Sequence, residues 1–255
     1  MPYKVIHVRI LLTVAYDGTS YAGWQRQTNA ITIQQKLEEA LSTLLARPVI
    51  TAGSSRTDAG VHALGQRVAF TAPDLRVPLD KLPMVLVGLL PPDIAVSSAL
   101  EVPGDFNPRF APLHKTYHYN ISNIAVPNPL NNRYSAFVPQ KLCVGSMSAA
   151  ARCFEGRHDF VAFCATGGSA QTTDREIYNC NVCNNNGLIT ISITGNAFLY
   201  NMVRIIAGTL VYVGMGKLQA HDIPQIIASK DRKRAGKTMP PHGLTLVDVC
   251  MDDIK

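Results

Sequence analysis

The sequence predicts an α+β protein built from two ferredoxin-like halves, each with the element order β-α-β-β-α-β. Two observations lead to this fold class. Apolar residues alternate along short stretches, as in half-buried strands, and recur at helical spacing between those stretches. The same order of elements then occurs twice within 255 residues, a length that accommodates two domains. We expect an N-terminal half over residues 1–107 and a C-terminal half over 108–255.

The first half begins with a strand and follows the split order of a ferredoxin-like unit. Thr32 and Gln35 have the spacing of a capping box, which predicts a helix from Thr32 to about Ala46. The other elements expected here are strands at 5–16, 48–52, 66–72 and 94–102 and a second helix at 78–90.

The second half repeats this order with an inserted loop and one extra helix. A long connection rich in Asn and Pro covers residues 125–140, and loops of this length are usually functional. The elements expected here are strands at 115–124, 177–183, 188–194 and 244–251, helices at 145–155, 199–212 and 221–229, and a loop at 156–173. Two such halves can place their sheets edge to edge and leave a cleft between them.

The composition is that of a globular protein with a basic surface. Hydrophobic residues make up 47% and charged residues 16%, which argues against disorder. The net charge of +6 suits a polyanionic partner such as nucleic acid, although a basic surface kept only for solubility is also common. We expect no membrane span and no secretory signal, and therefore a cytoplasmic protein with reduced cysteines.

The cysteines do not predict a metal site. Cys180 and Cys183 have metal-like spacing, but they lie in an expected strand, where positions three apart face opposite sides. No second pair of Cys or His residues follows at ligand spacing, so no zinc is expected.

The stretch from Ser54 to His62 carries the densest set of chemically active side chains. It contains Arg56, Asp58 and His62, and it lies between two expected strands, which hold a loop rigidly. Asp58 has no second carboxylate nearby, so a two-carboxylate mechanism is not supported. A lone aspartate can act as a nucleophile if a cation keeps it ionised, but Asp and Gly here could also serve only the turn.

Three further features are candidates for a site. Arg204 lies in an almost wholly apolar helix, where it either pairs with a carboxylate or extends from the helix edge to water. Tyr117 shares one face of a strand with Lys115 and Tyr119, and it could stack on a base or pack in the core. Arg109 and the basic run at 230–237 suit phosphate contacts.

Six groups of residues, in the same order along the chain, resemble the motifs of the TruA-type tRNA pseudouridine synthases. The block from Arg56 to His62 is similar to the catalytic signature of that family, and Gly65-Gln66 continues it. The other similar groups are Tyr16–Thr19 with Gly23–Gln25 and Thr32–Gln34, Lys115–Tyr119, His158–Phe160, Gly195 with Phe198-Leu199 and Met202–Arg204, and Pro241–Leu244.

The resemblance implies a fold and a reaction. The fold would be two ferredoxin-like halves related by a pseudo-twofold axis, with their sheets joined into one largely antiparallel sheet around a central active-site cleft. The reaction would be the isomerisation of uridine to pseudouridine in the anticodon stem-loop of tRNA, at tRNA positions 38, 39 and 40. The protein would be a homodimer, and the reaction would need no cofactor and no metal.

The resemblance also implies roles for particular residues. Asp58 matches the nucleophile, Tyr117 the tyrosine that stacks on the target base, and Arg204 the arginine paired with the aspartate. Arg56 matches an arginine that holds the target nucleotide out of the stack, and Leu244 matches an apolar residue of the pocket wall. His62, in the signature block, and Arg109, at the crossover between the halves, are expected to contact the substrate.

The chain departs from the family pattern in two places. Ser55 stands where many members have glycine, and Phe106-Asn107-Pro108 stands where they have Phe-His-Ala. Two other classes of function fit the residues taken alone. A non-catalytic RNA-binding module would bind tRNA without releasing the C5 hydrogen of uridine, and a small-molecule enzyme would bind tRNA weakly with no strong salt dependence.

Overall fold

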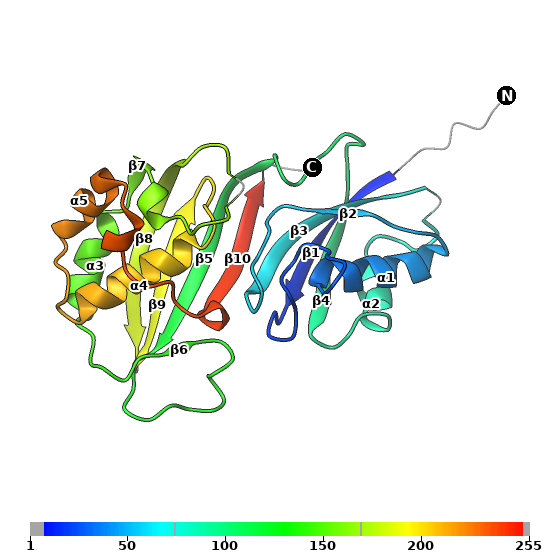
Figure 1. Ribbon diagram of the computed structural model, residues 1–255. Coiled ribbons are helices and arrows are strands. Elements are labelled where there is room, and N and C mark those ends of the chain that lie inside the picture. Colours follow the sequence, from blue (N-terminus) through cyan, green and yellow to red (C-terminus); the bar gives the residue numbers. More distant parts are fainter. Residues whose placement is uncertain (1–7, 74, 169, 252–255) are drawn as a thin grey trace. The chain divides into compact units, whose positions relative to one another are not determined.

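The computed structural model describes residues 8–73, 75–168 and 170–251, and it divides the chain into two compact units (Figure 1). Unit 1 comprises Met1–Leu113 and Leu246–Lys255, and unit 2 comprises His114–Thr245. The division therefore falls at Leu113/His114, six residues after the expected boundary at 107/108. The last strand in the sequence thus lies mostly in unit 1, together with the first half of the chain.

Unit 1 is built on a sheet in which the pairings among its first four strands are antiparallel. Its strands are β1 (Val8–Tyr16), β2 (Thr51–Gly53), β3 (His62–Ala72), β4 (Ile94–Val102) and, from Leu246 onward, β10 (Leu244–Met251). The strand order is β4-β1-β3-β10, and the short β2 also pairs with β3. β1 is antiparallel to both β3 and β4, and its buried residues alternate with less buried ones toward its end, as the apolar pattern predicts.

Two helices complete unit 1. In α1 (Ile33–Leu45), the Thr32 hydroxyl accepts the Gln35 amide hydrogen at 3.3 Å, so the expected helix start is confirmed. The Gln35 side chain does not complete a capping box, because it donates to Glu39 at 2.8 Å. α1 is tied to β2 through Glu38, whose Oε1 accepts from the Thr51 amide at 3.0 Å. α2 (Leu82–Val87) is shorter than expected and carries Pro83 in its first turn, where a missing N–H costs nothing.

Unit 2 also has a mostly antiparallel sheet. Its strands are β5 (Pro112–Ser122), β6 (Ala136–Phe137), β7 (Gly156–Asp159), β8 (Asp174–Asn185) and β9 (Leu188–Gly195). Their order is β5-β9-β8-β7, and only the short β6 runs parallel to its neighbour β5 among the pairings described. The β8–β9 hairpin turns at Asn186 and Gly187, both with positive φ, as a two-residue turn of the primed type requires.

The helices of unit 2 are α3 (Val144–Arg152), α4 (Met202–Gly214) and α5 (Asp222–Ser229), with single 3₁₀ turns η1 (Val161–Phe163), η2 (Arg232–Arg234) and η3 (Pro241–Gly243). Figure 1 shows α4 crossing β8 and β9, with α3 and α5 beside it. α4 is buried on nearly all sides, as its apolar sequence predicts. The aromatic ring of Phe163 meets those of Phe154 and Phe160 edge to face, with centroid distances of 5.1 Å and 6.1 Å.

The elements differ from the sequence-based expectation in a few places. The region 156–173 is not a plain loop, since it contains β7 and η1. The strand expected at 48–52 starts only at Thr51, because Pro48 has no N–H to donate to a neighbouring strand. The strand expected at 66–72 begins earlier, at His62, and residues 5–7 of the first expected strand lie outside the described residues.

Candidate functional site

Asp58 lies in the loop between β2 and β3, where its backbone opens a tight turn. The Val61 amide donates to the Asp58 carbonyl oxygen at 3.1 Å, and Gly60 has a φ of +76°. A positive φ at the third position of a four-residue turn favours glycine, which explains Gly60. Asp58 itself is half-buried and follows the buried Thr57. The backbone around the carboxylate is thus held in one conformation.

An aromatic segment, from Tyr16 at the end of β1 to Trp24, anchors this loop. The Tyr16 hydroxyl lies 2.7 Å from the Thr57 hydroxyl, the Trp24 amide donates to the Thr57 carbonyl at 3.0 Å, and the Gly60 amide donates to the Tyr21 carbonyl at 3.3 Å. The three aromatic side chains are 2–8% exposed. Of the two roles open to aromatics in a loop, stacking on bases or anchoring to the core, the structure shows anchoring for these three.

Two glycines let the aromatic segment approach the Asp58 loop closely. A Cβ atom on Gly18 would lie 2.0 Å from the Val61 carbonyl oxygen. A Cβ atom on Gly23, where φ is +89°, would lie 2.6 Å from the Thr57 carbonyl oxygen. Both obstacles are backbone atoms, which cannot move aside as the end of a side chain can. The sequence Asp17-Gly18 therefore serves this contact as well as the turn that ends β1.

Arg56 and His62, which flank Asp58, lie in different surroundings. Arg56 is exposed, whereas the His62 side chain is 3% exposed. The His62 Nδ1 atom lies 3.1 Å from the Gly18 amide nitrogen and 3.1 Å from Asp17 Oδ1. These contacts make His62 part of the packing that joins the start of β3 to the end of β1.

Gln66 closes the base of the loop, a role that the sequence did not predict. Its side chain is fully buried. Its Oε1 accepts from the Ser54 hydroxyl at 2.9 Å and from the Ser55 amide at 3.2 Å, and its Nε2 donates to the Ser55 carbonyl at 2.6 Å. One amide group thus holds both strands together where β2 ends. The only signal in the sequence was that Gly65-Gln66 continues the signature block.

Ser55 provides a test of local packing. Its hydroxyl is buried and has no hydrogen-bond partner among the described residues, an arrangement that costs free energy. We expect Ser55→Ala to raise the free energy of unfolding by about 1 kcal/mol, measured by urea denaturation. Ser54→Ala is the matched control and should lower it by about 1 kcal/mol, because the Ser54 hydroxyl donates to Gln66. A Ser55→Ala protein less stable than the parent would contradict this account.

Tyr117 lies on β5 in unit 2, opposite Ile193 of β9. Its side chain is 8% exposed, and its ring meets the Phe198 ring edge to face, with 5.1 Å between the centroids. Tyr119, two positions along, is fully buried, so the expected shared face of the strand is confirmed. Phe198 is a second residue that sequence reasoning did not assign to the site.

Arg204 is in the first turn of α4 and is held from two sides. Its Nε donates to the Met239 carbonyl at 2.7 Å, and one terminal nitrogen donates to Asn201 Oδ1 at 2.5 Å. Its own carbonyl oxygen accepts from the Met239 amide at 3.2 Å. Asn201 precedes the helix with a φ of +60°. The half-buried guanidinium is therefore aimed by protein groups and does not simply extend into water from the helix edge.

Tyr119 links Arg204 with the segment that carries Leu244. The Tyr119 hydroxyl donates to the Pro240 carbonyl at 2.8 Å. Burial raises the pKa of this hydroxyl well above its ordinary value, although the nearby Arg204 guanidinium acts in the opposite direction. Tyr119 thus stays protonated and continues to donate. Gly243 packs on its ring, and the following Leu244 is 6% exposed.

Arg109 follows β4 and belongs to unit 1, not to the second half where the sequence placed it. It is exposed, and its guanidinium carbon lies 6.0 Å from the centre of the Phe110 ring, which is 80% exposed. The predicted site residues are thus distributed over both units. Arg56, Asp58, His62 and Arg109 lie in unit 1, and Tyr117, Arg204 and Leu244 lie in unit 2.

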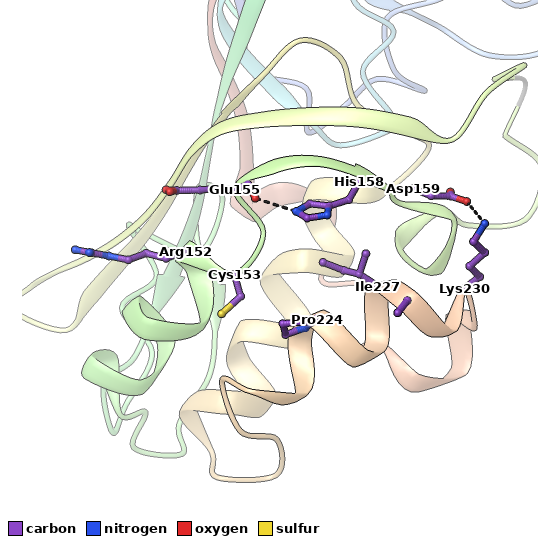
Figure 2. Close-up of a pocket in the computed structure, with 9 residues that line it drawn as sticks. Arg152, Cys153, Glu155, His158, Asp159, Pro224, Ile227 and Lys230 are labelled. Atoms are coloured by element: carbon purple, nitrogen blue, oxygen red, sulfur yellow. Dashed lines mark hydrogen bonds and ion pairs between the residues drawn. The ribbon is translucent and has the colours of Figure 1, made fainter.

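A pocket of about 440 Å³ in unit 2 contains none of these residues (Figure 2). It lies between the end of α3, β7 and α5, and its charges are mixed. At one side, Lys230 Nζ lies 2.7 Å from Asp159 Oδ2, and this hydrogen bond lowers the pKa of the Asp159 carboxyl. Within it, His158 Nε2 lies 2.9 Å from the Glu155 carbonyl oxygen. This pairing of opposite charges does not favour a particular ligand.

The described residues contain no group of three or more His, Cys, Asp or Glu side chains placed to hold a metal ion. Cys180 is buried and Cys183 is exposed, as expected for positions three apart on a strand. None of the helices in the described parts of the chain has the length and apolar character needed to span a membrane.

Comparison with known proteins gives a consistent result along the chain. Residues 12–111 and 150–252 match a protein family described as tRNA pseudouridine synthase. Proteins called tRNA pseudouridine synthase A from Caldicellulosiruptor bescii and Ruminiclostridium cellulolyticum are each 49% identical to it, over 94% of this chain and 98% of theirs. The protein of that name from Geotalea uraniireducens is 46% identical, with the same coverage.

A solved structure described as a Cbf5-Nop10-Gar1 complex aligns with 95% of this chain and 60% of that chain. The TM-score is 0.35 and the sequence identity 12%, values too low to carry an argument about fold.

Proposed function

This chain belongs to the tRNA pseudouridine synthase family, and on that premise we propose how its residues carry out the reaction. The protein is an enzyme that isomerises uridine to pseudouridine in tRNA. The reaction breaks the bond between uracil N1 and ribose C1′, turns the base, and joins C5 to C1′. The intermediate must not be captured by water, which requires a site that excludes it.

We propose that Asp58 is the nucleophile. The observation that carries this assignment is the half-buried carboxylate at the start of a turn whose backbone is held on both sides. In one route, an Asp58 oxygen bonds to C1′ as the N1–C1′ bond breaks and uracil leaves with the electron pair. The turned base then attacks C1′ through C5, displaces Asp58, and loses the C5 proton. In the other route an Asp58 oxygen adds to C6 of the base, the electron pair of the C5=C6 double bond moves to C5 and O4, and the carboxylate is expelled when that double bond re-forms.

Arg204 and Tyr117 are proposed to act with Asp58. We propose that Arg204 keeps the carboxylate ionised, which a cation close to an aspartate favours. The hydrogen bonds from Arg204 to Met239 and Asn201 support this role, because they orient the guanidinium before any substrate arrives. Tyr117 is proposed to stack on the target base and to relay the C5 proton, and Leu244 to form part of the apolar wall.

Arg56 and Arg109 are proposed as substrate contacts, and His62 as a positioning residue. Both arginines are exposed, which suits contacts with phosphates or with the space left by an extruded nucleotide. The burial of His62 and its contacts with Asp17 and Gly18 favour support of the loop over direct contact with RNA.

The relay role of Tyr117 can be separated from its ring. We expect Tyr117→Phe to lower kcat by about 10²-fold, the low end of what a positioned acid or base contributes, with little change in the KM for tRNA. Tyr134→Phe is the control, since Tyr134 is also a tyrosine of unit 2 but is 46% exposed. If Tyr117→Phe kept full activity, the hydroxyl would not be the proton relay, and only the aromatic ring would take part in the reaction.

The target position and the assembly are further parts of the proposal. From the resemblance, the target uridines are at tRNA positions 38, 39 and 40 of the anticodon stem-loop, and the enzyme is a cytoplasmic homodimer. We also propose that both units are ferredoxin-like and that their sheets join around the active-site cleft. A ferredoxin-like unit 1 is supported by the strand order β4-β1-β3, with β2 also paired to β3. A ferredoxin-like unit 2 is supported by the strand order β5-β9-β8.

One experiment tests the function as a whole. Purified protein is incubated with unmodified tRNA, and pseudouridine is mapped along the product while the release of tritium from C5-labelled uridine gives the rate. We expect pseudouridine at positions 38–40 from the parent protein and none from Asp58→Ala. Pseudouridine formed only outside the anticodon stem-loop would overturn the proposed target.

A further inference from the structure

A second pocket in unit 2, which we call the lysine pocket, has a uniform charge. It has a volume of about 460 Å³ and lies at the C-terminal end of α4. Its lining residues are Gln140, Lys141, Tyr212, Met215, Lys217 and Lys237. No acidic side chain lines it, in contrast to the pocket beside α5.

The three lysines come from three separate segments, and no counter-charge lies beside them among the described residues. All three are exposed, and within the part of the chain that the structure describes none has a carboxylate oxygen within 4.0 Å. The Lys217 ammonium lies 5.4 Å from the centre of the Tyr212 ring, which orients it toward the pocket lining. Three like charges around one hollow repel each other, so the arrangement favours an anionic ligand.

The backbone that carries Lys141 is fixed on both sides. The Asn123 side chain donates to the Gln140 carbonyl at 2.8 Å and accepts from the Leu142 amide at 3.2 Å. The Cys143 amide then donates to the Gly214 carbonyl, in the last turn of α4, at 2.9 Å. These bonds hold the segment against the end of α4.

The backbone at Lys237 lies directly on α4, because two glycines allow it. A Cβ atom on Gly208 would lie 1.9 Å from the Lys237 carbonyl oxygen, and one on Gly236 would lie 2.4 Å from backbone atoms of α4. The Gly236 amide donates to the buried Thr209 hydroxyl at 2.8 Å. Lys217 is held in turn by its own amide, which donates to the Tyr212 carbonyl at 2.9 Å. All three lysines therefore stand on fixed backbone.

We propose that the lysine pocket binds consecutive phosphates of the tRNA backbone, as a contact separate from the nucleotide that reacts. This inference rests on the proposed function, which makes tRNA the substrate. Lysine acts as a point charge without the planar geometry that reads base edges, so the contact is independent of sequence and positions the RNA. A backbone with a charge at every nucleotide can offer a phosphate to each of the three ammonium groups, whereas one small anion offers a single centre of charge.

The pocket lies on the same helix and segment as Arg204. Tyr212 is eight residues beyond Arg204, or about 12 Å along α4. Lys237 is two residues before Met239, whose carbonyl and amide both bond to Arg204. RNA held in the lysine pocket is thus placed within a few nucleotides of the start of α4.

The test removes the three charges and compares salt dependence. The variant is Lys141→Gln/Lys217→Gln/Lys237→Gln, and the matched control is Lys36→Gln/Arg76→Gln/Lys81→Gln in unit 1; each lowers the net charge from +6 to +3. We expect the pocket variant to bind tRNA about 10- to 100-fold more weakly at 0.1 M salt, with a salt slope reduced by about 2–3. Its kcat at saturating tRNA should equal that of the parent, because the lost contacts stabilise the bound substrate and the transition state equally. The control should keep the parent slope and affinity.

Chemical labelling gives a second measurement that uses the parent protein. Bound tRNA should protect the ammonium groups of Lys141, Lys217 and Lys237 from acetylation, while inorganic phosphate at the same phosphate concentration should not. An unchanged salt slope in the pocket variant, or labelling unaffected by tRNA, would overturn the inference. Protection by inorganic phosphate alone would overturn it in favour of a small-anion site. In each case the parent enzyme would still form pseudouridine, so the proposed function is judged separately.

Discussion

Replacing Asp58 by asparagine is expected to lower kcat for pseudouridine formation by at least about 10⁴-fold, because the amide is a far weaker nucleophile than the carboxylate. The turn itself should survive, since the Asp58 carbonyl oxygen accepts its hydrogen bond and asparagine keeps that carbonyl and also suits turns. We therefore expect tRNA to bind with little change in affinity. Tritium release from C5-labelled tRNA under single-turnover conditions measures the chemical step.

The control for this substitution is Asp80→Asn, another aspartate of unit 1, whose carboxylate is exposed beside Lys81. It should leave both kcat and the affinity for tRNA within about twofold of the parent values, as most surface substitutions do. An Asp58→Asn enzyme with kcat within tenfold of the parent would show that the carboxylate is not the reacting group. Loss of tRNA binding in Asp58→Asn would instead show that the loop had collapsed, and thermal unfolding would reveal this directly.

The sequence identified the Asp58 loop because its signals are local. Gly60 and Asp58 are turn residues, and strand patterns flank them, so both the turn and the strands can be expected from neighbours in the chain. The contacts that hold the loop join distant segments. Gly18 permits the approach of Val61, and Gln66 joins the end of β2 to β3 by its amide. Such contacts depend on tertiary packing and leave no periodic signal in the sequence.

In unit 2, too, local sequence patterns predict the longer elements but not the contacts between distant segments. α4 and β10 were expected almost where they occur, since α4 is an almost continuous apolar stretch and β10 is rich in Leu and Val. β7 was missed, because Gly156–Asp159 contains no β-branched or large apolar residue that would mark a strand. The partners of Arg204 were also missed. Asn201 lies three residues before Arg204 at the start of α4, whereas Met239 lies 35 residues further along the chain, and only folding brings its carbonyl oxygen to the guanidinium.

Replacing Arg204 by glutamine is expected to lower kcat by roughly 10³-fold. In the proposed mechanism its guanidinium keeps the Asp58 carboxylate ionised, and glutamine has no charge with which to do so. The control is Arg232→Gln. The Arg232 guanidinium also donates to the segment that carries Met239, at 2.9 Å to the Gly236 carbonyl and 3.1 Å to the Thr238 hydroxyl. Both variants should therefore lose some stability in thermal unfolding, but only Arg204→Gln should lose catalysis.

A double-mutant cycle on the free energy of unfolding then distinguishes an Arg204 that pairs with Asp58 from an Arg204 that only supports its own unit. If Arg204 stabilises the Asp58 carboxylate, the destabilisation of Asp58→Asn/Arg204→Gln should fall short of the sum of the single changes by about 0.5–3 kcal/mol. The corresponding cycle of Asp58→Asn with Arg232→Gln should be additive within about 0.5 kcal/mol. Additivity in both cycles would mean that Arg204 acts only on its own unit, through Met239 and Asn201, and that another cation must serve the nucleophile.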